Sequence, residues 1–363
     1  MKLATFMMPL HPPGRRPADT LAEDREAILL ADKLGFCEAY VGEHVTDLAE
    51  NVTSCLMFLA SLAHETKHIV LGSGTINMPN SHPAAIAAQV AMLDHMLKGR
   101  FIMGISPGGL MSDAEVFGNY QKDRNAIFLE SINMVLDIWK GEGPYELKGN
   151  FFEVTTKKTM IAEIGQGTIL KPYQQPHPPI VVTAVAPHSK GVMEAAKRGW
   201  MPISANFLLP EWVATHWKKL VEGKPDAKPA DWRVAKSIFV ADDDKVAERY
   251  GRSPEGPYHF YFKQLVRKLV GFGGRSNLFK LDQSQPDGAI TADYVTQKLV
   301  LAGTVNSVVD QILAFRETTG EFGTLLYPCH DWLDPALARR SMQLMAEQVM
   351  PRINAALNSG RPV

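Results

Sequence analysis

The chain has 363 residues, of which 38 are basic and 39 acidic, and its formal net charge at pH 7 is −1. Because no long run of either sign occurs, this balance gives no electrostatic footprint for nucleic acid or for an anionic membrane. No stretch reaches the roughly 18 to 20 apolar residues that a membrane span needs. We therefore expect a soluble, cytoplasmic protein whose partner is a small molecule.

Three widely separated cysteines, Cys37, Cys55 and Cys329, offer neither the spacing of a metal site nor an even set for disulfides. This usage suits a reducing cytoplasm, and each thiol is expected to pack as a small apolar residue. No metal site is predicted.

Strand-forming and helix-forming segments alternate from the start of the chain. The apolar run before Pro9 lacks the cleavage region of a signal peptide and predicts a first strand. Helical periodicity from Thr20 to Leu34 follows and stops at Gly35, a usual helix terminator. Up to residue 140, the pattern predicts further strands over 36–41, 69–76 and 101–105, and helices over 54–64, 83–97 and 125–140.

The alternation continues to the end of the chain and is interrupted by two insertions, over about 141–175 and 253–290. The first has the turn residues of a hairpin, and the aromatic side chains of the second favour a lid or a partner surface over disorder. Eight strand–helix repeats predict an α/β fold, a (β/α)8 TIM barrel that forms one domain over 1–363, with a long excursion after strand 7. The remaining predicted strands are 180–184, 201–205, 234–240 and 323–327, and the remaining helices are 189–198, 212–221, 305–318 and 335–357.

The active site of such a barrel lies at the carboxyl ends of its strands, so polar residues at those ends are the candidates. The second strand ends at Glu43 and His44, where an imidazole can exchange a proton near neutral pH; a purely structural histidine is the alternative. The third strand ends in the small residues Gly74 and Thr75, followed by Asn77. Small residues let a flat ring approach the backbone, and they equally let a helix pack closely.

The fourth strand stops at Ser106 in a Gly/Pro-rich loop, and Arg124 begins the helix beyond it. This arginine could clamp a phosphate with two hydrogen bonds, or it could pair with Asp113 or Asp123. The loop brings flexible backbone to one place, as a phosphorylated ligand requires, although a simple reversal of the chain gives the same pattern.

The fifth strand carries Thr183 and Ala184 at its end and leads into His188 and Ser189. The free amides and the positive dipole end of the helix that starts there would bind a phosphate, and simple capping by Ser189 is the alternative. Weaker candidates near later strand ends are Ser204, Asn206, His330 and Asp331.

Several short motifs occur together in a fixed order. They are Gly42-Glu43-His44, Ser81-His82-Pro83, the stretch from Leu97 to Gly108, Val116-Phe117-Gly118 and the run from Gln175 to Ile180. In this order they resemble the bacterial luciferase-like flavin monooxygenases over nearly the whole chain. The loop over 106–114 resembles that of the limonene and diketocamphane monooxygenases.

The resemblance implies a barrel that takes reduced FMN from a separate flavin reductase, adds O2 to form a flavin C4a-peroxide, and oxygenates a small apolar substrate such as a terpenoid, ketone or aldehyde. It also implies a homodimer. Carried over by motif, His44 is the acid/base or peroxide-stabilising residue beside the flavin ring, and Ser106 is the second catalytic candidate. The residues implied to bind the cofactor are Glu43, Gly74, Thr75, Asn77, Ser106, Arg124, Thr183, Ala184, His188 and Ser189.

Two departures from the family pattern and two alternative functions remain. Luciferases carry a cysteine where this chain has Ser106 and an arginine where it has Pro107, which argues against efficient light emission.

The same barrel family includes deazaflavin (F420)-dependent enzymes that transfer a hydride, but their cofactor tail needs a basic channel, and only Arg124 and Lys190 stand out here. A non-catalytic flavin-binding protein is the other alternative, and His44 together with the eight-strand pattern argues against it.

Overall fold

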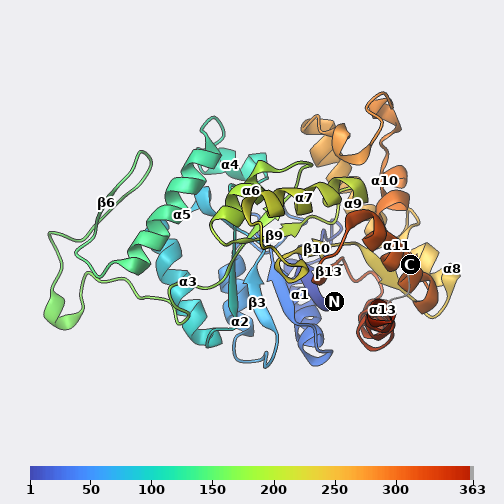
Figure 1. Ribbon diagram of the computed structural model, residues 1–363, viewed down its shortest axis with the longest axis horizontal. Helices are drawn as coiled ribbons and strands as arrows, with labels where there is room; N and C mark the ends of the chain where they lie inside the picture. Colours follow the sequence, from blue (N-terminus) through green and yellow to red (C-terminus); the bar gives the residue numbers. More distant parts are fainter. Residues whose placement is uncertain (360–363) are drawn as a thin grey trace. The chain divides into compact units, whose positions relative to one another are not determined.

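The computed structural model describes residues 1–359 and contains the predicted barrel (Figure 1). Its strands are β1 (Lys2–Met7), β2 (Glu38–Val41), β3 (Val70–Ser73), β4 (Ile76–Asn77), β5 (Phe101–Ser106), β8 (Ile180–Ala184), β9 (Met201–Ser204), β10 (Arg233–Ala235) and β13 (Thr324–Cys329). They form one sheet in the order β3-β2-β1-β13-β10-β9-β8-β5-β4, and the additional pairing of β3 with β5 closes it. Because β3 and β4 are consecutive pieces of one strand, both paired in parallel with β5, the fold is an eight-stranded (β/α)8 barrel.

Helices follow the barrel strands, as the alternation predicts. They are α1 (Pro17–Lys33), α2 (Cys55–Leu62), α3 (Pro83–Leu97), α4 (Met111–Val116), α5 (Arg124–Lys140), α6 (Lys190–Lys197), α7 (Pro210–Gly223), α8 (Asp244–Gly251), α9 (Pro257–Val266), α10 (Ala292–Leu299), α11 (Val305–Thr319), α12 (Pro335–Leu344) and α13 (Met350–Asn358). Polar side chains fix where several begin. Ser54 accepts a hydrogen bond from the amide of Met57 at the start of α2, and Asp123 accepts from the amides of Asn125 and Ala126 at the start of α5.

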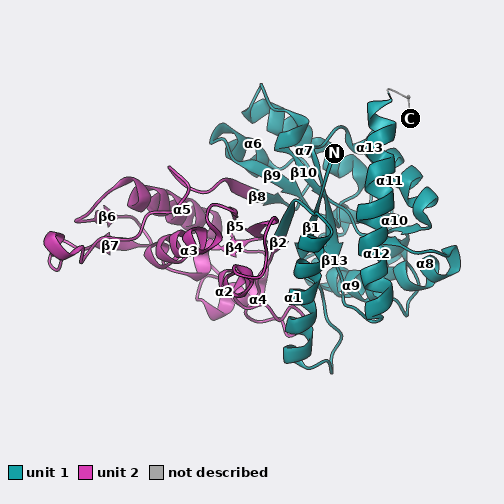
Figure 2. Cartoon of the chain, turned by 90° about the horizontal axis from the view of Figure 1, so that it is seen from below, with its two compact units in different colours: residues 1–39, 182–363 teal, residues 40–181 magenta. Residues whose placement is uncertain are grey.

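The chain divides into two compact units, unit 1 with residues 1–39 and 182–363 and unit 2 with residues 40–181 (Figure 2). Each unit has its own buried aromatic side chains. In unit 1, the fully buried Trp232 stacks on Trp217 with ring centroids 5.8 Å apart. In unit 2, Phe101 is fully buried on β5. Burial of one such side chain stabilises the fold by about 1.5–3 kcal/mol.

The prediction of one continuous seventh strand over 234–240 is wrong, because the segment contains two short strands that belong to different sheets. The barrel strand β10 ends at Ala235, and β11 (Ile238–Val240) pairs in parallel with β12 (Leu301–Gly303) in a separate sheet. The switch occurs at Ser237, whose carbonyl accepts a hydrogen bond from the amide of Leu301. A continuous apolar run predicts extended backbone but does not identify the strand that it pairs with.

The predicted closing helix over 335–357 is also interrupted. A π-helical turn, Met345–Val349, separates α12 from α13. Pro351 lies in the first turn of α13, where its missing amide hydrogen breaks the regular hydrogen-bond pattern of the preceding turn.

The insertion over 141–175 contains the predicted hairpin. Its strands β6 (Glu146–Lys148) and β7 (Glu153–Thr155) are antiparallel and reach out beyond α5 (Figure 1). The carboxylate of Glu130 on α5 anchors the turn of this hairpin. It accepts hydrogen bonds from the amides of Asn150 at 2.7 Å, Phe151 at 2.8 Å and Phe152 at 2.9 Å.

The insertion over 253–290 is folded, which agrees with the preference for order over disorder. It contains α9, a π-helical turn over Arg267–Phe272 and two short 3-10 turns. The ammonium of Lys280 fastens its second half by donating to the carboxylate of Asp287 at 2.7 Å and to the carbonyl of Gln285 at 2.8 Å. A lid function for this segment remains a prediction.

The three cysteines are free thiols, with Cys55 and Cys329 buried and Cys37 partly so, as their spacing predicts. Burial raises the pKa of the Cys329 thiol to about 12. None of the helices within residues 1–359 is both long and apolar enough to cross a membrane.

A buried cluster of charges in unit 1 holds the loop after β1 to α1. The imidazole of His11 lies 2.7 Å from the carboxylate of Asp331 and 3.2 Å from that of Asp24. Arg15 adds hydrogen bonds to Asp331 and Glu23. Burial alone would lower the pKa of His11, but hydrogen bonds and charges from Asp24 and Asp331 outweigh it and raise this pKa to about 9.

The raised pKa of His11 predicts a loss of stability at alkaline pH. A histidine whose pKa rises from 6.5 to about 9 on folding stabilises fully below about pH 6.5 and loses that contribution as the pH rises through about 9. The contribution is on the order of 3 kcal/mol. We therefore expect the free energy of unfolding in urea to be clearly higher for wild type than for His11→Gln at pH 7. At pH 10, most of this difference in free energy should be lost. An equal gap at both pH values would contradict this role.

Candidate active site

The end of β2 places His44 between two carboxylates of unit 2. Its Nδ1 lies 2.9 Å from Oδ2 of Asp113 on α4, and its Nε2 lies 3.5 Å from Oε2 of Glu50. All three side chains are mostly or fully buried. Each ring nitrogen of His44 thus faces an acidic group, which is an arrangement suited to holding and moving one proton.

The hydrogen bonds around Asp113 favour its ionised form beside His44. Besides the imidazole, its carboxylate accepts hydrogen bonds from the amides of Val45 at 3.2 Å and Thr46 at 2.9 Å, and from the Thr46 hydroxyl at 2.6 Å. Burial alone would raise the pKa of Asp113, but the hydrogen bonds from His44 and Thr46 outweigh it and hold this pKa below its usual range. An ionised Asp113 keeps the Nδ1 proton of His44 in place and fixes the orientation of the ring.

The sequence marks Asp113 only as a possible partner of Arg124, and that alternative is wrong. Arg124 instead donates to the carbonyl of Gly108 at 2.9 Å and contacts the sulfur of Met111, while Asp123 caps α5. Glu50 was not a candidate at all. It follows His44 in an irregular loop, where no spacing rule marks it.

Ser106 sits in a directed chain of hydrogen bonds at the ends of β4 and β5. The Thr75 hydroxyl donates to the Ser106 hydroxyl at 2.7 Å, Ser106 donates to the side-chain oxygen of Asn77 at 3.1 Å, and the Asn77 amide donates to the carbonyl of Glu43 at 3.0 Å. The amide of Gly108 also donates to Ser106, at 3.2 Å. The Ser106 proton is therefore committed to Asn77, and its oxygen accepts two hydrogen bonds.

Glu43 ties two loops together instead of standing free. Its carboxylate accepts from the amides of Cys55 and Asn77, each at 3.0 Å. The neighbouring Gly74–Thr75 peptide bond is cis. The small residues at this strand end bring backbone close to the hydrogen-bonded side chains of Ser106 and Asn77.

The remaining predicted cofactor residues lie in unit 1, where α7 fixes the loop after β8. Thr183 and Ala184 are the last residues of β8. Burial lowers the pKa of His216 on α7 to about 4, so this imidazole is neutral. The indole of Trp232 donates to the Ser204 hydroxyl at 2.9 Å, and that hydroxyl lies 2.8 Å from Nδ1 of His216. Nδ1 thus accepts, and the Nε2–H of His216 donates to the carbonyl of Ala186 at 2.8 Å.

The same loop ends in His188 and Ser189 at the start of α6. His188 has a positive φ of 52°, and its amide donates to the Thr215 hydroxyl at 2.8 Å. Ser189 occupies the N-cap position, but its side chain makes no capping hydrogen bond, so simple capping is wrong. The amide of Val192 in the first turn donates to the carbonyl of Ser189 at 3.2 Å, which leaves the amides of Lys190 and Gly191 for an anion.

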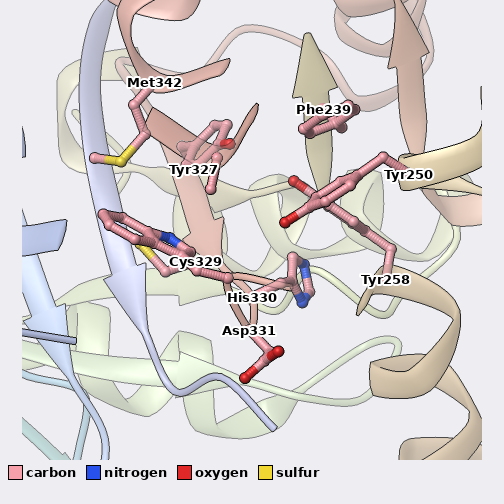
Figure 3. A pocket seen from close by; sticks show the side chains of 10 residues that line it. Phe239, Tyr250, Tyr258, Tyr327, Cys329, His330, Asp331 and Met342 are labelled. Carbon is pink, nitrogen blue, oxygen red and sulfur yellow. The ribbon is translucent and has the colours of Figure 1, made fainter. Parts of the chain in front are cut away.

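The weaker candidates lie in three different settings. Ser204 faces α7, and Asp331 belongs to the His11 cluster. His330 packs against Tyr258 of α9, with ring centroids 4.1 Å apart, beside a cavity of about 10 Å³ that has room for one water molecule (Figure 3). The ring centroid of Tyr261, also on α9, lies 4.6 Å from that of His330. Burial lowers the pKa of His330 to about 3, so this side chain is a neutral part of the packing under α9.

Residues 1–321 match the family model described as luciferase-like monooxygenase. The chain belongs to this family. It is 28% identical to 4-hydroxyprotoasukamycin monooxygenase of Streptomyces nodosus subsp. asukaensis, with 99% of this chain and 94% of that protein covered. It is 27% identical to limonene 1,2-monooxygenase of Rhodococcus erythropolis, with 97% and 86% covered.

A solved structure adds the cofactor of one relative. The oxygenating constituent of 3,6-diketocamphane monooxygenase from Pseudomonas putida, a type II Baeyer-Villiger monooxygenase in complex with FMN, superposes with a TM-score of 0.84 at 25% identity, covering 97% of this chain and 98% of that chain. These three relatives of this luciferase-like protein are thus monooxygenases, and one of them is in complex with FMN.

The residues of this luciferase-like protein fit FMN by the chemistry of their donors. A flat ring needs close backbone, and unit 2 has Gly74 at the end of β3 and Gly108 in the loop after β5, neither with a side chain beyond a hydrogen. A phosphate needs amide donors and a cation. Unit 1 offers the uncapped first turn of α6, and Arg124 in unit 2 has no carboxylate partner within residues 1–359.

Proposed function

We propose that this protein is the oxygenase of a two-component flavin monooxygenase. It would take reduced FMN from a separate flavin reductase and use O2 to oxygenate a small apolar substrate such as a terpenoid, ketone or aldehyde. The observation that carries this proposal is the burial of His44 between Asp113 and Glu50 at a strand end of a luciferase-like barrel. Bound reduced flavin would supply the electrons for activating O2.

His44 has the role of acid and base in this proposal. Its Nδ1–H is committed to Asp113, so Nε2, which faces Glu50, is the nitrogen that takes up and releases a proton. Ser106 has a positioning role, because its hydroxyl proton is already donated to Asn77. The strand end around Gly74 and Thr75 would seat the ring and keep water from it.

The phosphate and the partners follow from the rest of the chain. The loop of His188 and Ser189 and the guanidinium of Arg124 are the proposed phosphate contacts, and Thr183 and Ala184 line the approach on β8. The segment over 253–290 is proposed as the lid above the substrate. We also propose a homodimer, because unit 2 exposes apolar side chains that include Met57, Val116 and Ile164.

Isotope labelling tests the proposed reaction. The protein is supplied with reduced FMN, ¹⁸O2 and a panel of terpenoids and cyclic ketones, and products are analysed by mass spectrometry. We expect one ¹⁸O atom in the product with reduced FMN, and no product with reduced deazaflavin. Reduction of a ketone by reduced deazaflavin without O2 would instead establish hydride transfer.

A further inference from the structure

We infer that Arg275, on the excursion after α9, is a phosphate-binding residue of the flavin site, closing on the loop between β8 and α6. This inference rests on the proposed function, since it names a further residue for the same phosphate. All the residues that carry it belong to unit 1.

Arg275 already contacts the loop that leads into α6. Its Nη2 donates to the carbonyl of Val185 at 3.3 Å, one residue beyond the end of β8. The side chain is half-buried. This contact joins the excursion to the loop that carries His188 and Ser189.

The guanidinium of Arg275 has more donors than the protein uses. Within residues 1–359, Val185 is its only hydrogen-bond acceptor, and no carboxylate lies within ion-pair distance. Several other arginines of unit 1 are paired with carboxylates, as Arg252 is with Glu248 and Arg340 with Asp242. A half-buried guanidinium with unused N–H groups is suited to an anion.

The loop facing Arg275 is held ready for such an anion. The His216 imidazole fixes the carbonyl of Ala186, and the Thr215 hydroxyl fixes the amide of His188. The amides of Lys190 and Gly191 in the first turn of α6 follow directly. A phosphate monoester at this point would receive hydrogen bonds from the backbone amides of α6 and from the planar guanidinium of Arg275.

The backbone of Arg275 is anchored within the excursion. Its amide donates to the carbonyl of Leu269 at 2.9 Å, and the next residue, Ser276, donates from its hydroxyl to Asp287 at 2.7 Å. Asp287 is in turn bound by Lys280. Binding of a phosphate by Arg275 would therefore hold the whole segment against the loop after β8.

The test compares FMN with riboflavin, which lacks the phosphate, in wild type and two variants. Arg275→Gln removes the proposed contact. Arg267→Gln removes the same charge from an exposed position of the same excursion and is the matched control. Dissociation constants are measured by flavin fluorescence, and hydrogen exchange is followed over 267–280 with each flavin.

Wild type is expected to bind FMN more tightly than riboflavin, and FMN alone is expected to slow exchange over 267–280. Arg275→Gln should weaken FMN binding about tenfold or more and leave riboflavin binding unchanged, because a charge-assisted hydrogen bond is lost. Arg267→Gln should leave the dissociation constants of both flavins unchanged. If wild type prefers FMN and Arg275→Gln keeps that preference, the inference is overturned while the proposed function stands. Equal binding of FMN and riboflavin by wild type would refute the phosphate site itself.

Discussion

Replacing His44 with glutamine is expected to lower product formation from reduced FMN and O2 by about 10²-fold or more, as loss of an acid/base group does. FMN binding should stay within about tenfold of wild type, because backbone, not this ring, is proposed to seat the flavin. The imidazole lies between Asp113 and Glu50, and glutamine cannot carry its proton. Product per O2 consumed and the dissociation constant of FMN are the two measurements.

His64→Gln is the matched control for this variant. His64 is an exposed histidine of the same unit, so the same substitution there should leave both measurements unchanged. If His44→Gln coupled O2 to product as well as wild type does, His44 would have no part in the mechanism.

Asp113→Asn is expected to lower product formation by at least about tenfold, because a neutral amide no longer holds the proton on Nδ1 of His44. The effect should depend on His44. In the double variant Asp113→Asn, His44→Gln, product formation should be almost the same as in His44→Gln alone, since the two side chains act together in one step. Product formation is measured in wild type, both single variants and the double variant.

The control here is Asp123→Asn, the same change at a helix cap. Asparagine caps a helix about as well as aspartate does, so activity and stability should both be preserved. Thermal unfolding separates a positioning role from a folding defect, because Asp113 also holds the amides of Val45 and Thr46. Additive losses in the double variant would show that Asp113 acts independently of His44.

The barrel was predictable because its elements obey short-range rules. The helix over Pro83–Leu97 and the strand over Ile180–Ala184 have the predicted bounds, since proline, apolar periodicity and β-branched runs are local signals. The strand over 234–240 failed because strand pairing is a long-range choice. Its second half pairs with Leu301–Gly303, which is more than sixty residues away in the chain.

The candidate site was predictable only one residue at a time. Strand ends identified His44 and Ser106, since barrel topology places such residues together. The partners of His44 were not identified, because Asp113 lies 69 residues away and Glu50 sits in an irregular loop. Asn77 and Glu43 were expected to touch a cofactor, whereas their hydrogen bonds hold each other and the neighbouring loop.

The central claim is that this protein protects the reaction of reduced FMN with O2. Stopped-flow absorbance after mixing the protein and reduced FMN with oxygenated buffer tests it most directly. We predict a transient species, spectrally distinct from reduced and oxidised FMN, that lasts for seconds and decays faster when a suitable apolar substrate is added. Oxidation at the rate of free reduced FMN, with no transient, would contradict the account.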